Sequence, residues 1–528
     1  MQRISLHILI GAFISLFLGV FILSCAMVTP RSSPADRDRR QPHPGRDLAR
    51  QHCGTCHPVP KPDQLPRETW PFVLDWMGNY LGYPKTDGRL DNLVDEELIP
   101  EEPTIGDQEL KALRDFFTSG ASPGPLRPAD KPPMQTGLRF FEPVERNLLP
   151  VKNAYITSVK IDQQANRLFV GYGDENMLVR YDAIGDRIST AGGITFDTQP
   201  VGVATSEDTV YVTLIGDLMR GRNKGQVVRL RPWKGKIEAT HLIQGYHRTS
   251  HALLHDLDGD GRQDIIVSGF GDFGEGRLAW FENLGGHQNG THRYREHILW
   301  NRDGALKTAV HDFTGNGRPD IMTLIAQERQ ELLLYRNQGN GAFERTQILR
   351  KFPGFGVNSF ELADFNDDGL MDILLINGNN MEFPDPPLRD YHGLRILLNQ
   401  GDLEFKEAYF YPMYGAIGAR VADFTGNGLL DIAAISLFPD WSSDQPESFV
   451  FLRQRTSMEF TPVTHPATQG ARWLSIDAGD LDGNGTTDLV LGEGGFLHGI
   501  PEALHHSFLA RSKETPPVLI LKNVGEHE

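Results

Sequence analysis

Short runs of apolar residues alternate with polar turns from residue 137 to residue 525, and this pattern predicts β-strands throughout. In one stretch, four strand-like segments follow one another at 307–311, 321–325, 332–335 and 343–348. The arrangement recurs roughly every 56 residues, and a regular period of this size indicates an array of similar units. Four antiparallel strands repeated around an axis form a β-propeller blade, so about 390 residues predict a mainly β fold with seven blades. Six or eight blades are the alternatives.

A polar nine-residue loop precedes the second strand-like segment in five of the predicted blades. Each loop has oxygen-bearing side chains at positions 1, 3, 5 and 9 and a glycine at position 6, where a sharp turn can wrap the chain around a cation. Asp, Asn and Gly are also common turn formers, but five copies in register favour up to five calcium ions. The predicted side-chain ligands are Asp256, Asp258, Asp260, Asp264, Asp312, Thr314, Asn316, Asp320, Asp364, Asn366, Asp368, Asp372, Asp423, Thr425, Asn427, Asp431, Asp480, Asp482, Asn484 and Asp488.

These tandem Asp-x-Asp-x-Asp-Gly-x-x-Asp loops resemble the FG-GAP/VCBS repeats, a family that includes the calcium-bearing propeller blades of integrin α-chains. The resemblance is strong over residues 240–525 and weak over 137–240, where two blades without Asp loops are expected. It implies that the Asp loops join strands 1 and 2 on one face and that the loops between strands 2 and 3 lie on the other. The long, aromatic and polar examples of the latter are 269–277, 377–391, 438–447 and 492–506.

Strand 1 of each blade is expected to line the central channel. The charged and polar residues at similar places on these strands are His251, Lys307, Glu361, Arg420 and Asp477. Such a mixture of charges could hold a polar ligand, or the side chains could simply pair with one another. Both alternatives remain open from the sequence.

An apolar run from residue 4 to residue 23 precedes Cys25 and is typical of an export signal. The residues before Cys25 resemble a bacterial lipobox, which predicts a lipoprotein signal peptide over 1–25 and lipidation of Cys25. An uncleaved membrane anchor is the alternative. Both place the protein outside the cytoplasm, tethered to a membrane and either periplasmic or surface-facing. Residues 26–44, rich in Pro, Ser, Arg and Asp, are expected to be a disordered linker.

The motif Cys53-Gly-Thr-Cys56-His57 predicts one covalently bound haem c. Cys53 and Cys56 would form the thioethers, and His57 would be the proximal iron ligand. Helices are expected at 45–52 and at 108–117, the second with Asp107 as its N-cap. Met77 is the predicted distal ligand, although a buried Met is more often a core residue. Residues 45–125 thus resemble an all-α monohaem c-type cytochrome domain, followed by a linker over 126–136.

The net charge of −17 argues against a nucleic-acid partner. No arrangement of nucleophile and base stands out in the sequence, and no glycine-rich phosphate loop is visible. The sequence therefore favours a membrane-tethered electron-transfer protein whose propeller recognises a redox partner protein or an extracellular polymer. Asp440 and Trp441 are expected to contribute to that recognition. One alternative is an oxidoreductase with a substrate site in the propeller, possibly with a quinone cofactor, and another is an adhesive or carbohydrate-binding module.

Overall fold

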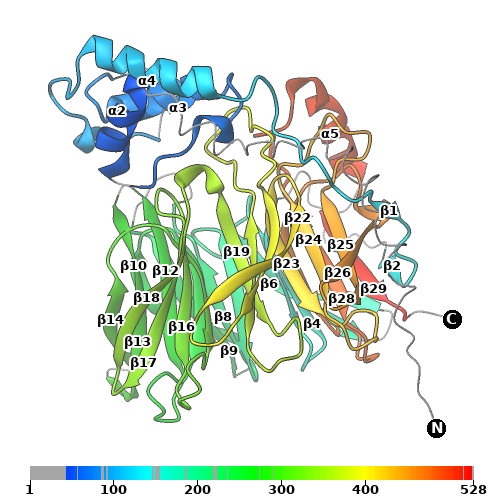
Figure 1. Ribbon diagram of the computed structural model, residues 1–528. Helices are drawn as coiled ribbons and strands as arrows, with labels where there is room; N and C mark the ends of the chain where they lie inside the picture. Colours follow the sequence, from blue (N-terminus) through cyan, green and yellow to red (C-terminus); the bar gives the residue numbers. More distant parts are fainter. Residues whose placement is uncertain are drawn as a thin grey trace, which may run out of the picture.

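The computed structural model describes residues 43–55, 57–84, 88–90, 93–144, 148, 155–184, 187–217, 223–234, 236–272, 274–288, 291–514 and 517–525. The predicted signal peptide with Cys25, most of the first linker, and Cys56 lie outside these residues. The described chain forms a β-propeller with a small helical unit on one of its faces (Figure 1).

Seven four-stranded antiparallel sheets form the blades of the propeller. Six and eight blades are therefore excluded. Blades 1 to 4 comprise β3 (Ile156–Asp162), β4 (Arg167–Tyr172), β5 (Met177–Ile184) and β6 (Arg187–Thr195); β7 (Pro200–Ser206), β8 (Thr209–Leu214), β9 (Gly225–Trp233) and β10 (Lys236–Tyr246); β11 (Thr249–His255), β12 (Asp264–Asp272), β13 (Glu275–Gln288) and β14 (Thr291–Trp300); β15 (Ala305–His311), β16 (Asp320–Ile325), β17 (Glu331–Gly339) and β18 (Ala342–Arg350). Blades 5 to 7 comprise β19 (Val357–Ala363), β20 (Asp372–Asn377), β21 (Gly393–Asn399) and β22 (Phe405–Pro412); β23 (Ala416–Ala422), β24 (Asp431–Ser436), β25 (Phe449–Thr456) and β26 (Glu459–Thr464); β27 (Trp473–Gly479), β28 (Asp488–Glu493), β29 (Val518–Asn523) and β2 (Phe141–Val144).

The ring is closed by a strand from the start of the propeller sequence. β2 pairs antiparallel with β29 and so completes the seventh blade with residues from the opposite end of the chain. A further short strand, β1 (Gln135–Thr136), pairs parallel with β26 and adds a fifth strand to the sixth blade. The predicted second linker, 126–136, therefore ends in this strand.

The second strand of most blades is buried along its whole length. All six residues of β16, β20, β24 and β28 are buried, because each strand lies between two others and between two neighbouring blades. This explains why the sequence shows continuous apolar runs here and not a strict alternation. The apolar clusters join neighbouring blades; one, for example, contains Leu324 of blade 4 and Phe360 of blade 5. The core is therefore a ring of interfaces between blades.

The helical unit consists of α2 (Pro44–His52), α3 (Trp70–Asn79) and α4 (Asp107–Gly120), with the short helices η1 (Cys53–Thr55), η2 (Pro62–Gln64), η3 (Gly88–Leu90) and η4 (Glu96–Leu98). α2 packs closely on α4, and a Cβ at Gly45 would lie 2.2 Å from the carbonyl oxygen of Ala112. The rings of Trp70 and Phe117 stack at 4.3 Å in the core of the unit. α4 extends beyond the predicted 108–117, and its N-cap is Gly106, whose N–H donates to the Glu109 carboxylate.

Two expected loops contain regular structure. Residues 269–277 largely continue β12 and β13, which meet at a tight turn, and residues 492–506 include the start of α5 (Glu502–Glu514). The remaining short helices are η5 (Pro353–Phe355) and η6 (Pro466–Thr468). Among the described residues, no helix combines the length and apolar character that a bilayer crossing requires.

Candidate functional site

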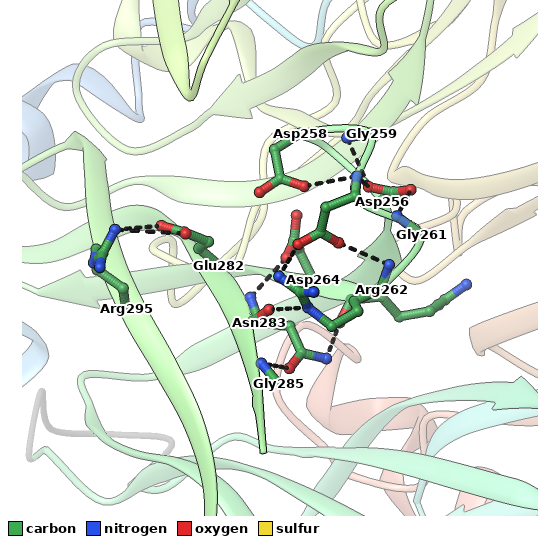
Figure 2. Close-up of polar contacts among 12 residues, drawn as sticks. Asp256, Asp258, Gly259, Gly261, Arg262, Asp264, Glu282, Asn283, Gly285 and Arg295 are labelled. Carbon is green, nitrogen blue, oxygen red and sulfur yellow. Dashed lines mark hydrogen bonds and ion pairs between the residues drawn. The ribbon is translucent and has the colours of Figure 1, made fainter.

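Each Asp loop is held in shape by its first carboxylate. In loop 256–264, Asp256 Oδ1 accepts from the N–H of Gly259 at 2.8 Å, and Oδ2 accepts from the N–H of Gly261 at 2.8 Å (Figure 2). The same bond from position 6 to position 1 recurs in the other four loops at 2.7–2.9 Å. The position-6 glycine adopts a positive φ, +82° at Gly261, which L-residues with a side chain rarely accept.

The carboxylates of two loops come together as metal ligands would. Among the described residues, one group contains Asp256, Asp258 and Asp260, with one oxygen from each within 4.8 Å of the others. The second such group contains Asp480, Asp482 and Asp488. Hard oxygen donors around a glycine turn match the ligand chemistry of calcium. Both groups belong to the predicted ligands, and the donor sets fit this cation.

The ninth-position aspartates have a structural role that the sequence did not reveal. Their side chains are buried. Four of the five carboxylates accept two backbone N–H groups, whereas Asp431 accepts one backbone N–H and the Thr425 hydroxyl. Asp320 accepts from Phe313 at 3.0 Å and from Asn337 at 2.7 Å. The other four accept in the same way from strand 3, at 2.8 Å from Asn283, Asn399, Gln454 and Asn523. Each ninth residue thus ties its loop to strand 3 of its own blade.

This arrangement explains the recurring Asn-x-Gly sequence at the end of strand 3. Asn337 Oδ1 accepts from the N–H of Gly339 at 2.9 Å, which fixes the side chain. Its Nδ2 then donates to the carbonyl of Leu257, in the Asp loop of the preceding blade, at 2.9 Å. Asn523 makes the equivalent bond to Phe424 at 2.8 Å. The Asn337 and Asn523 side chains therefore connect neighbouring blades beneath the loops.

Burial and hydrogen bonding act on the pKa of the ninth-position carboxylates in opposite directions, because burial raises it and the backbone N–H donors lower it. Burial raises the pKa of Asp264, Asp431 and Asp488 to about 6. Cationic side chains partly balance the loops, since Arg262 pairs with Asp260 and the Lys522 amine lies 2.7 Å from Asp482. A bound divalent cation would favour the ionised carboxylates still further.

Cys53 of the CxxCH motif lies directly after α2, and His57 lies shortly after it. Cys53 begins η1 and packs partly buried against the apolar core of the helical unit. His57 Nδ1 lies 3.1 Å from the carbonyl oxygen of Pro58. A carbonyl can only accept, so Nδ1 carries the proton and Nε2 keeps the lone pair that an iron ligand needs. Met77 lies half-buried in α3 and stays a predicted ligand.

The helical unit contacts the face of the propeller that bears the loops between strands 2 and 3, here called the 2–3 face. The Tyr391 hydroxyl donates to the carbonyl of Gln64 at 3.1 Å, and the rings of Phe72 and Phe383 lie 5.8 Å apart. Burial and then the charge of Arg350, at the end of β18, lower the pKa of His57. The CxxCH motif is therefore close enough to the propeller to experience its charges.

The segment after α4 is bound across the propeller by several contacts. Arg127 pairs with Asp440 at 2.7 Å, and Lys131 pairs with Glu447 while lying 4.9 Å from the ring of Tyr411. The Tyr414 hydroxyl donates to the carbonyl of Leu126 at 3.0 Å. We call residues 126–136 the strap. Asp440, which the sequence analysis assigns to partner recognition, is engaged by the strap in this structure.

Comparison with known proteins identifies the repeats. The FG-GAP-like repeat family matches residues 256–323 and 312–375. Residues 256–375, which lie in blades 3 to 5, are FG-GAP-like repeats. Among curated proteins, none matches this chain.

Several solved structures resemble the chain at low identity. Sqt1 of Saccharomyces cerevisiae has 11% identity and a TM-score of 0.42, covering 71% of this chain and 97% of its own. The WD40 β-propeller domain of Doa1 has 10% identity and a TM-score of 0.41, covering 73% and 96%. A putative 6-phosphogluconolactonase from Bacteroides uniformis has 14% identity and a TM-score of 0.40, covering 58% and 83%.

The channel side chains of the propeller pair with one another. Glu361 accepts from Lys307 and from Arg420 at 2.8 Å each. Asp477 accepts from Arg420 at 2.9 Å and from Lys160 at 3.1 Å. This outcome favours the self-paired alternative over a ready-made ligand site.

The channel residues lie at two levels, not one. His251 and Lys307 are the third residues of their strands, whereas Glu361, Arg420 and Asp477 are the fifth. Lys160 of β3 is a further channel residue that the sequence did not indicate. Its blade has no Asp loop, and in the other blades the position of strand 1 was inferred from that loop.

Proposed function

We propose that this protein is an exported, membrane-tethered haem c electron-transfer protein in which a calcium-binding propeller is the recognition surface. The observation that carries the proposal is the state of His57 within the CxxCH motif. Its Nδ1–H donates a hydrogen bond to the Pro58 carbonyl at 3.1 Å, so Nε2 is the nitrogen available to iron. The His57 imidazole is therefore in the state that a proximal haem ligand requires.

The surroundings of the motif also suit this group. Cys53 stands directly after α2, and the helix packs against α4 through Gly45 and Ala49. Such packing fixes the attachment residues relative to the core of the helical unit. When bound, the haem would supply one-electron redox chemistry. The chain would hold it through Cys53, Cys56 and His57, with Met77 as the proposed sixth ligand.

The propeller's two faces divide the proposed tasks. The Asp loops join strands 1 and 2, and the helical unit contacts loops between strands 2 and 3, which leave the sheets at the opposite end. Calcium in the Asp loops would therefore stiffen the blades without touching the helical unit. The strap already occupies part of loop 438–447, so the part of the 2–3 face near α5 remains for a redox partner protein or an extracellular polymer.

The haem is tested on the full chain by pyridine-haemochrome spectroscopy. We expect one haem per chain that resists extraction by acidified organic solvent. The double variant Cys53→Ala with Cys56→Ala should lose covalent attachment. Cys25→Ala is the matched control and should keep it. A stoichiometry near zero in the unmodified chain would overturn the proposal.

The electron-transfer role is tested by asking what reduces the haem. A carrier should be reduced by another cytochrome and not by small metabolites or polysaccharide fragments. His57→Ala should abolish this redox activity while leaving partner binding intact. Rapid reduction by a metabolite alone would instead select the oxidoreductase alternative.

A further inference from the structure

A groove opens on the outer wall of the propeller between blades 3 and 4. It has a volume of about 490 Å³. Trp280 and His297 line it from blade 3, and Tyr335, Phe343 and Arg345 line it from blade 4. The strands that supply these residues, β13, β14, β17 and β18, lie at the outer side of the molecule, away from the channel (Figure 1). The volume is within the range of small-molecule sites.

Two buried hydrogen-bond donors in this groove have no acceptor. The Trp280 indole N–H and the Tyr335 hydroxyl are buried and have no acceptor, since Arg345 beside the hydroxyl can only donate, and the two residues are only 1% and 2% exposed. Buried donors in folded proteins nearly always have an acceptor. Burial raises the pKa of Tyr335 to about 12, although the neighbouring Arg345 acts in the opposite direction. The hydroxyl therefore keeps its proton at neutral pH and can donate it.

The charged groups of the groove add a further donor. Arg345 lies 5.3 Å from the ring of Trp300 and has no carboxylate partner among the described residues. The nearby carboxylate of Glu282 is already used, since it accepts from His297 at 2.8 Å and pairs with Arg295 at 3.2 Å. In a protein of net charge −17, an arginine that has no carboxylate partner among the described residues, beside two donors without acceptors, marks a locally electropositive, acceptor-poor site.

The walls of the groove restrict the class of ligand. His297 stacks on Trp280 with ring centroids 4.3 Å apart and an interplanar angle of 9°, so this face of the indole is covered. Sugar stacking on the indole is therefore disfavoured. Phe343 contacts the Trp280 edge, and Ile298 at the mouth is 50% exposed, so an apolar body could be covered here.

We propose that this groove binds a small organic carboxylate, with its oxygens accepting from Trp280, Tyr335 and Arg345 and its apolar body against Phe343 and Ile298. A carboxylate supplies the acceptors that the buried donors lack and the negative charge that the arginine lacks. This site is separate from the helical unit and does not depend on the proposed haem.

The test is isothermal titration calorimetry of the full chain with benzoate, benzyl alcohol and inorganic phosphate. Benzoate should bind saturably, and the other two should bind at least tenfold more weakly. Arg345→Gln and Tyr335→Phe should each weaken benzoate binding at least tenfold. Arg336→Gln is the matched control, because this neighbouring side chain pairs with Glu344 at 2.7 Å and does not line the groove.

Several results would overturn the proposal. Absence of saturable benzoate binding would do so directly. If benzyl alcohol bound as tightly as benzoate, the negative charge would not contribute to binding. If phosphate bound as tightly as benzoate, the apolar body would not contribute. Equal losses in Arg345→Gln and Arg336→Gln would show that binding occurs elsewhere. A thermal melt of each variant confirms that the fold is intact before titration.

Discussion

At the scale of single residues, the ninth-position aspartates have two roles. As carboxylates they are among the predicted calcium ligands, and as buried acceptors they fasten each Asp loop to strand 3. Asp320 accepts from two backbone N–H groups, and Asn337 provides one of them. The ninth-position aspartates therefore have a structural role that a metal-binding interpretation of the motif alone does not include.

Asp320→Ala should destabilise the protein even when no metal is present. The substitution leaves two buried N–H groups without an acceptor, at about 1–3 kcal/mol each. We expect the free energy of unfolding to fall by about 2–4 kcal/mol, measured by urea denaturation in excess chelator. Glu344→Ala, an exposed substitution in the same blade, should cost less than about 0.5 kcal/mol. A negligible effect of Asp320→Ala in chelator would mean that the residue acts only through a metal.

At the scale of the elements, the same irregularity marks every blade. The pairing of strands 1 and 2 shifts register after the first residue in all seven, as between Ile156 and Ser158 in blade 1 and between Ala305 and Lys307 in blade 4. The first two blades lack Asp loops but keep this β-bulge. The blades thus share one backbone plan whether or not a metal loop is present.

The sequence predicted the repeating elements well and the non-repeating ones poorly. Buried second strands such as 321–325 give continuous apolar runs, and the period places them. The closing strand Phe141–Val144 gives no such signal, because it is short, contains a proline and lies at the edge of a sheet. β1 and α5 were missed because their positions depend on neighbouring blades. The contact between Asp440 and Arg127 joins residues 313 positions apart and could not be read from local pattern.

The Asp loops should differ in calcium affinity. Loop 256–264 offers four carboxylates at its ligand positions, whereas loop 312–320 offers two with Thr314 and Asn316. Because charge strengthens binding of a hard cation, Asp258→Ala should remove one bound ion at low free calcium, and Thr314→Ala should remove none there. Flow dialysis with calcium measures the number of bound ions in each variant.

Chelator should also lower the Tm, because an ion that binds only the folded state stabilises it. An unchanged Tm would argue against structural calcium.

The strap should loosen when its ion pair is broken. Burial favours the protonated acid, but hydrogen bonds from Ser442 and Arg127 outweigh it and hold the pKa of Asp440 below its usual range. The stabilisation that the ionised Asp440 carboxylate gives to the folded state is therefore present above about pH 4 and is lost as the pH falls further. Because Arg127 is 55% exposed, Asp440→Asn should cost only about 0.5–1 kcal/mol. Hydrogen exchange of residues 126–136 should accelerate, whereas Asp444→Asn, an exposed control, should leave it unchanged.

At the scale of the whole molecule, the ring is held together by devices that join blades. β2 links the two ends of the propeller, and the channel ion pairs link strands from the first, fourth, fifth, sixth and seventh blades. Lys160 and Asp477 are 317 residues apart in sequence, so only the closed ring brings them together. The helical unit and the strap add contacts on the 2–3 face. These contacts place the helical unit and the strap on the same face of the propeller.

The channel pairs give the final prediction. Burial alone would raise the pKa of Glu361, yet the charges of Lys307 and Arg420 outweigh burial and lower that pKa. The stabilisation from the ionised Glu361 carboxylate is therefore lost only in acid, below about pH 4. At neutral pH, Glu361→Leu should lower the free energy of unfolding by about 2–4 kcal/mol, because it leaves Lys307 in the channel without its carboxylate.

Adding Lys307→Met should recover most of this loss, since Arg420 keeps Asp477 as its partner and no charge is left unpaired. Urea denaturation of the two variants at pH 7 measures the recovery. A double variant as unstable as Glu361→Leu alone would show that the channel is held by the shape of these side chains and not by their charges.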